Sequence, residues 1–98
     1  GEQATPTDVV LEANYPNPFN DQTILRYRLN ANGPARLDVY NLSGQKVRTL
    51  VDQTQEAGVY NIAGNGQDAG GRSVASGVYL ACLKSSGAMQ VQKMLLLK

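Results

Sequence analysis

About seven short segments of alternating apolar and polar residues, each followed by a turn signal, constrain the fold of this chain more than any other feature. The clearest is Gln22 to Leu29, in which Leu25, Tyr27 and Leu29 share one face and two arginines take the other. A period of two is the pattern of a half-buried β-strand. No helical period of convincing length occurs in the sequence, so we expect an all-β fold.

The remaining expected strands are Val9 to Ala13, Ala35 to Tyr40, Gln45 to Val51, Val59 to Ala63, Gly77 to Lys84 and Met89 to Leu97. In the strand that ends at Tyr40, alternation directs Asp38 outward. Gly44 is expected to supply the positive φ of a hairpin turn, and Gln53 to Ala57 to form a loop. Turns about every 8–12 residues favour an immunoglobulin-like antiparallel β-sandwich of about seven strands, although an open barrel would share this pattern.

The composition excludes several classes of function. The 98 residues have room for one domain, and a net charge of +1 gives no field for nucleic acid. No apolar run approaches the roughly 20 residues that cross a bilayer. The chain lacks the histidine that a thiol nucleophile would need, so we expect its one cysteine, Cys82, to be a small buried hydrophobe. The carboxylates are scattered singly, and Asp68 is expected to hold a glycine-rich turn. We therefore expect no catalytic site, metal, cofactor or small-molecule substrate.

Residues 1–8 are interpreted as a linker remnant, because they lack the charged and apolar sections of a signal peptide, and residues 9–98 as the folded module. Near its start lies Asn14-Tyr15-Pro16-Asn17-Pro18-Phe19-Asn20, whose two prolines prevent a continuous strand. We expect Asn17 and Pro18 to guide the entering chain across the sandwich and Phe19 to plug the core.

Near the end, Gly77-Val78-Tyr79 is expected to mark a turn entering a strand, with Gly77 permitting a tight approach and Tyr79 packing between the sheets. The tail from Lys93 to Lys98 does not alternate, so its apolar side chains point to both faces and a lysine stands at each end. Such a strand at a sheet edge would offer unpaired N–H and C=O groups to a receptor strand, while the lysines suppress indiscriminate pairing.

These blocks, in this order, resemble the C-terminal sorting domain of the type IX secretion system of the Bacteroidetes, the Por secretion tail. They are also similar to the immunoglobulin-like repeat of the flagellar hook-capping protein. The resemblance covers Leu11 to Lys98, and its blocks are Tyr15 to Asn20, Thr23 to Leu29, Val39 to Val47, Ala57 to Tyr60, Ala75 to Tyr79 and Lys93 to Lys98. The family commonly has a tryptophan where this chain has Gly64, so either another side chain fills that gap or the strand ends earlier.

The resemblance implies a non-catalytic address tag that directs a larger, N-terminal passenger through the outer membrane. The partners implied are proteins of the secretion apparatus and a separate protease that cleaves near the linker before Val9. The passenger would pass through the periplasm and be released or attached at the cell surface. The residues expected to carry recognition are Gly77, Val78, Tyr79, Lys93 and Lys98, and deletion of Gln92 to Lys98 is expected to trap the passenger in the periplasm.

Two other functions fit the composition. A carbohydrate-binding module of a secreted glycoside hydrolase would need an aromatic platform, for which Tyr40, outward by alternation, is the candidate because the chain has no tryptophan. A spacer or assembly repeat would need no recognition residues, and it would fail to direct export of a reporter protein.

Overall fold

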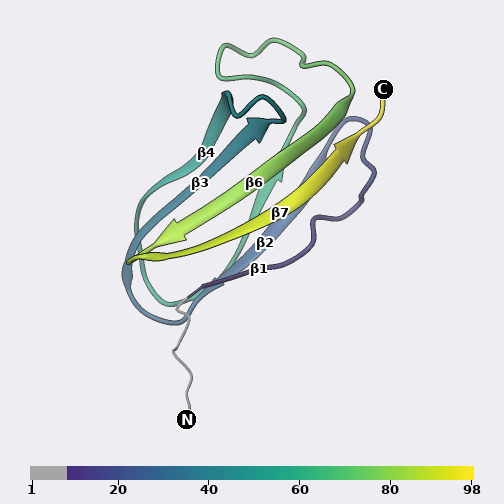
Figure 1. The fold of residues 1–98 in the computed structure, drawn as a ribbon. Helices are drawn as coiled ribbons and strands as arrows, with labels where there is room; N and C mark the ends of the chain where they lie inside the picture. The colour runs from purple at the N-terminus through teal and green to yellow at the C-terminus, as the bar shows by residue number, and fades with distance from the viewer. Residues whose placement is uncertain (1–8) are drawn as a thin grey trace.

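The structure is a computed structural model that describes residues 9–98, and these residues form two antiparallel sheets packed face to face (Figure 1). The strands are β1 (Val9–Leu11), β2 (Thr23–Leu29), β3 (Gly33–Asn41), β4 (Lys46–Gln55), β5 (Gly58–Gly64), β6 (Gly77–Ser85) and β7 (Ala88–Leu96). One sheet has the order β1-β2-β5 and the other β4-β3-β6-β7. The predicted β-sandwich of about seven strands is confirmed. The described residues, 9–98, contain no helix that could span a membrane.

The alternation in β2 produces the core of the three-stranded sheet. Leu25, Tyr27 and Leu29 are at most 1% exposed, and the residues between them face solvent. Tyr27 lies opposite Tyr60 of β5, and their rings stack with centroids 5.3 Å apart. The buried core also takes side chains from β1, the β1–β2 connection and the second sheet: Val9, Leu11, Phe19, Ala35, Leu37, Val51, Tyr79, Ala81, Leu83, Met94 and Leu96. Phe19 therefore plugs the core, as expected.

The two hairpins of the four-stranded sheet close as their turn residues require. Gly44 has φ +85° in the β3–β4 turn, which confirms its predicted role. The β6–β7 turn has two residues, Ser86 (φ +49°) and Gly87 (φ +84°), between the paired Ser85 and Ala88. Positive φ at both positions is the geometry of a type I′ turn, whose twist matches that of the flanking strands.

The predicted strand boundaries differ from the structure by at most two residues, as where β1 ends at Leu11 and not at Ala13, except at the end of β4, where they differ by four. Gln53 to Gln55 belong to β4, because they pair with Gly33 to Ala35 at the start of β3. Their polar side chains resemble a loop in sequence. β4 is an edge strand, on which Gln53 and Thr54 face water, while the half-buried Gln55 accepts a hydrogen bond from the hydroxyl of Tyr27 at 2.7 Å. The expected loop is thus reduced to the two residues 56 and 57.

Candidate recognition surface at the last strand

β7 lies at the edge of the four-stranded sheet, with β6 as its one neighbour in the sheet. Met94 and Leu96 point inward and are buried, whereas Leu95 is half-buried on the outer face. Leu97, just beyond the strand, is 50% exposed. The expected placement of tail side chains on both faces is therefore confirmed.

The prediction that the tail from Lys93 to Lys98 offers unpaired backbone groups to a receptor strand is wrong, because residues 17–20 bond to the outward backbone groups of this C-terminal half of β7. The N–H of Phe19 donates to the carbonyl of Leu95 at 2.9 Å, and the carbonyl of Phe19 accepts from the N–H of Leu97 at 2.9 Å. The side chain of Asn17 accepts from the N–H of Leu95 at 3.0 Å and donates to the carbonyl of Lys93 at 3.4 Å. The side chain of Asn20 donates to the carbonyl of Leu97 at 3.2 Å. Residues 17–20 therefore cover the outer edge of this half, and Figure 1 shows the connection that contains them running beside the end of β7.

Residues 14–16, which lead into the segment 17–20, are held in place by polar contacts that include β2. The side-chain amide of Asn14 is buried and donates to the hydroxyl of Thr23 at 3.0 Å and to the carbonyl of Pro16 at 3.2 Å. The Thr23 hydroxyl donates to the same carbonyl at 2.8 Å. Tyr15 and Ile24 exchange both backbone hydrogen bonds. The prolines thus interrupt the strand, as expected, and these bonds fix the interrupted chain against the sandwich.

The N-terminal half of β7 is different, because its outer edge is open. In an antiparallel strand, alternate residues direct both backbone groups to the same side. Lys93, Leu95 and Leu97 direct their backbone N–H and C=O groups away from β6, toward the outer edge of the sheet. Met89 and Val91 stand at the same alternate positions, so their backbone groups point toward this edge as well. Within residues 9–98 these outward groups have no hydrogen-bond partner. Gln90, between Met89 and Val91, points its side chain inward, and its Oε1 accepts a hydrogen bond at 2.7 Å from the N–H of Leu11 on β1, an edge strand of the other sheet.

The two predicted lysines have different environments. Lys93 is exposed, and no ion pair involves it within the described part of the chain. Lys98 lies beyond β7, where its N–H donates to the hydroxyl of Ser76 at 2.9 Å and its ammonium group to the hydroxyl of Ser73. Lys93 is therefore available to a partner, whereas Lys98 fastens the chain end to the loop before β6.

Gly77, Val78 and Tyr79 begin β6. Gly77 has φ +153°, which disfavours other residues, but a Cβ placed there would meet nothing within 4 Å. The glycine therefore permits a backbone conformation, and the tight approach predicted for it is wrong. Tyr79 packs in the core as predicted, and its hydroxyl donates to the carbonyl of Ala75, four residues earlier, at 2.5 Å. This contact has the form of the tyrosine corner of immunoglobulin-like domains.

The same corner occurs a second time, at the start of β5. Gly58 has φ +157°, and the hydroxyl of Tyr60 donates to the carbonyl of Glu56, again four residues earlier, at 2.6 Å. Both sites carry the sequence Gly-Val-Tyr. This repetition is a signal in the sequence that identifies the two corners without any structure.

The recognition residues and the N-terminal block meet on the outer face. A surface hollow is lined by Val78, Lys93 and Leu95 from β6 and β7 and by Asn17 and Pro18 from the connection. Gly44 lies apart from it, in the β3–β4 turn. The structure therefore brings four of the predicted residues together although they are separated by up to 76 positions.

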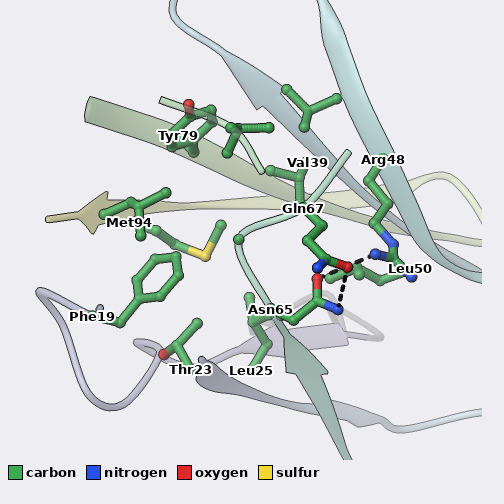
Figure 2. Close-up of a pocket in the computed structure, with 15 residues that line it drawn as sticks. Phe19, Thr23, Leu25, Val39, Arg48, Leu50, Asn65, Gln67, Tyr79 and Met94 are labelled. Carbon is green, nitrogen blue, oxygen red and sulfur yellow. Dashed lines mark hydrogen bonds between the residues drawn. The ribbon is translucent and has the colours of Figure 1, made fainter. Parts of the chain in front are cut away.

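A cavity inside the sandwich marks the position of the missing tryptophan. Gly64 is the last residue of β5, so the strand does not end earlier. Leu25 fills part of the gap, because its Cδ1 would lie 3.3 Å from a Cβ on Gly64, and a cavity of about 30 Å³ remains beside the glycine. Figure 2 shows it lined by the apolar side chains of Phe19, Leu25 and Met94. Its polar rim is a chain of hydrogen bonds from Arg48 to Asn65 to Gln67, each 3.2 Å long.

Among residues 9–98, Asp38 is the one buried carboxylate. It lies on the outer face of β3, as alternation predicts, but it is only 2% exposed. Burial raises the pKa of Asp38, but hydrogen bonds from Thr49 (2.6 Å) and Arg36 (2.8 Å) and the charge of Arg36 outweigh it and lower the pKa below the usual 3.8. The carboxylate is therefore a charged link between β3 and β4. Arg36 also pairs with Asp52 at 3.6 Å, and the described residues hold no cluster of three or more metal-binding side chains.

The other polar predictions concern turns and one tyrosine. Asp68 holds its turn as expected, because its side chain accepts from the N–H groups of Gly70 (2.9 Å) and Arg72 (3.0 Å). These bonds lower the pKa of Asp68. Cys82 is buried, as expected. Tyr40, the candidate for sugar stacking, is half-buried opposite Leu80, and the sugar-binding alternative has no support.

The geometry is thus that of a sandwich with a partly covered edge strand and no assembled catalytic group among residues 9–98. A profile of the family described as the secretion system C-terminal sorting domain matches residues 13–97. The chain belongs to this family of sorting domains. The family implies a protein that is secreted or transported to the cell surface, and its description names sorting and no catalytic activity.

A solved structure agrees with the fold of this sorting domain. The chain is similar to dimeric latent PorU from Porphyromonas gingivalis, with a TM-score of 0.66 and 20% sequence identity. The similarity covers 92% of the sorting domain and 9% of the PorU chain, so it concerns the fold alone. No curated protein matches the chain. The expected relation to the hook-capping repeat is not confirmed by these comparisons.

Proposed function

We propose that this sorting domain acts as the address of a passenger protein that precedes it in the same precursor, and that the type IX secretion apparatus reads its last strand. The family match over residues 13–97 carries this proposal. The position of β7 at a sheet edge, with Lys93 exposed, supports it, because a receptor can reach an edge strand without unfolding the sandwich.

After export, a separate protease removes the domain by cutting near the linker before Val9. The segment of this cut and the predicted linker remnant, residues 1–8, lie outside the described residues. The folded module from residue 9 to residue 98 supplies the signal, and Gly77, Val78, Tyr79, Lys93 and Lys98 are its proposed recognition residues. Of these, Val78 and Lys93 offer side chains on the outer face, whereas Gly77, Tyr79 and Lys98 shape and fasten the elements that present them.

Loss of export after deletion of Gln92 to Lys98 would not separate lost recognition from lost stability. The deletion removes Met94 and Leu96, which are buried in the core, so the truncated domain would also lose stability. A reversal of charge at Lys93 avoids this problem, because the side chain is exposed and has no ion pair in residues 9–98.

The test uses a reporter protein fused in front of the whole domain in a bacterium with a type IX system. We expect the fusion to be exported and Lys93→Glu to reduce export. The matched control is Lys46→Glu, which reverses an exposed lysine on β4 at the opposite edge of the same sheet and should leave export unchanged. A reporter that stays in the periplasm with the unaltered domain would contradict the proposed function.

A further inference from the structure

The open half of β7 lacks the features that normally protect an edge strand. Edge strands are commonly guarded by charged residues, prolines or bulges. The segment from Ala88 to Gln92 has no charge and no proline, and its pairing with β6 is regular throughout. Lys93 is the first charged residue on the strand and stands where the covering segment 17–20 begins. The chain thus covers one half of this edge with hydrogen bonds, whereas in the other half β1 packs beside the strand through Gln90 and the outward backbone groups have no bond within residues 9–98.

The outer face beside this open edge is apolar. Met89 and Val91 are 59% and 50% exposed, which places them among the most exposed apolar side chains of the described residues. Val91 lies opposite Cys82 of β6, whose side chain shares this outer face. A strand that paired with the open edge would therefore gain backbone hydrogen bonds and cover apolar surface at the same time.

The charges around this surface are positive and unbalanced. Lys84 lies opposite Met89, and Lys93 follows Val91 by two positions on the same face. Neither lysine forms an ion pair with any residue in 9–98, whereas the nearby Arg36 is already paired with Asp38 and Asp52. An incoming strand with carboxylates at the positions that face these lysines would neutralise them.

We propose that the free edge of Met89 to Gln92 is the docking site for one extended strand of the secretion apparatus. This strand is apolar where it meets Met89 and Val91 and acidic where it meets Lys84 and Lys93. The inference rests on the proposed sorting function and assigns the contact to one half of β7. A second copy of this chain fits the surface less well, since antiparallel self-pairing centred on Val91 would gather four lysines with no carboxylate between them. In such a pair, Lys84 of one copy lies two strands, or about 10 Å, from Lys93 of the other.

The decisive experiment compares two identical substitutions in the fused reporter. Val91→Lys places a charge on the open edge, whereas Val59→Lys makes the same change on β5, an edge strand of the other sheet, where the valine is 48% exposed. We expect export to fall about tenfold or more with Val91→Lys, the change that the loss of about 1.4 kcal/mol of binding free energy produces. We expect Val59→Lys to export normally, and thermal unfolding of the two purified domains to give similar midpoints.

Met89→Lys is the second variant, because a residue next to the turn, 59% exposed, tolerates substitution even if Val91→Lys impairs folding. Normal export of both β7 variants would overturn the docking site while leaving the sorting function intact. Equal loss of export with Val59→Lys would also overturn it, since the effect would then not belong to this edge. Analytical ultracentrifugation adds a further check. If the unaltered domain forms a dimer and Val91→Lys abolishes it, the edge binds a second copy of the chain, which would contradict the proposal.

Discussion

Replacement of Gly64 by alanine should stabilise the domain, because the cavity beside it has room for a methyl group. A Cβ at Gly64 would lie 3.3 Å from Cδ1 of Leu25 and 3.7 Å from Cγ2 of Thr23. Both atoms are at the ends of side chains that line the cavity of about 30 Å³. Leu25 can therefore shift into the cavity by the few tenths of an ångström that the new methyl group requires. Gly64 is not among the glycines with positive φ, so alanine adds no backbone strain.

The expected gain follows from two contributions. Burial of one methyl group contributes about 0.8 kcal/mol. The loss of backbone freedom in the unfolded chain contributes about 0.4–1 kcal/mol. After an allowance for the displaced Leu25, we expect the free energy of unfolding to rise by about 1 kcal/mol. For a domain of this size, that change raises the melting temperature by about 4–8 °C.

Urea unfolding of the purified domain measures this gain, and the slope of the transition should stay unchanged. Gly71→Ala is the control, because Gly71 has φ +81° and open space around it, so alanine there adds strain without any packing. We expect it to destabilise the domain by about 1 kcal/mol. A Gly64→Ala variant that is less stable than the unaltered domain would show that the cavity walls cannot yield.

Three further predictions concern the covered half of β7, the tyrosine corners and the buried carboxylate. Asn17→Ala should cost about 1 kcal/mol of stability and speed hydrogen exchange at the Leu95 amide, whereas unchanged protection there would contradict the covering contact. Tyr79→Phe should lower the free energy of unfolding, measured in urea, by about 1 kcal/mol. Tyr60→Phe should lower it by less, because the contact of the Tyr60 hydroxyl is exposed and water can take the place of the lost hydroxyl. A larger loss with Tyr60→Phe than with Tyr79→Phe would refute this reasoning. The pKa of Asp38 is lower in the folded domain than in the unfolded chain. The ionised carboxylate therefore stabilises the domain fully above its unfolded pKa, and this stabilisation is lost as the pH falls through the folded pKa. The stability difference between the unaltered domain and Asp38→Asn should therefore shrink between about pH 5 and pH 2, and a constant difference would exclude the ion pair as its source.

Local alternation predicts strands well where one face is buried. β2 follows the pattern at every position, and its boundaries differ from the prediction by one residue. The end of β4 is missed because its polar residues carry no alternation of hydrophobicity. They become a strand only through pairing with Gly33 to Ala35, about twenty residues away. Pairing of this kind depends on the rest of the fold, and a single segment does not encode it.

The same limit explains what was missed at the recognition surface. The apolar, two-faced character of the tail is a local property and is predicted correctly. The cover over its outer edge comes from Asn17 and Phe19, which are 76 or more positions away in sequence and reach β7 through hydrogen bonds. A prediction based on the tail alone therefore exposes the wrong half of the strand. The absence of charge from Ala88 to Gln92 is the signal in the sequence that identifies the open half.

The two halves of β7 consequently differ in what a substitution affects. Met94 and Leu96 fill the core, and the backbone around them is bonded to the segment 17–20, so changes in this half alter the stability of the sandwich. Met89 and Val91 contribute little to the core, and their outward backbone groups are free within residues 9–98, so changes there alter what can dock. Loss of export after a change in the last five residues is therefore ambiguous between unfolding and lost recognition. Substitutions at exposed positions of the open half, compared with equal substitutions on β5, separate the two, because the sandwich itself stays intact.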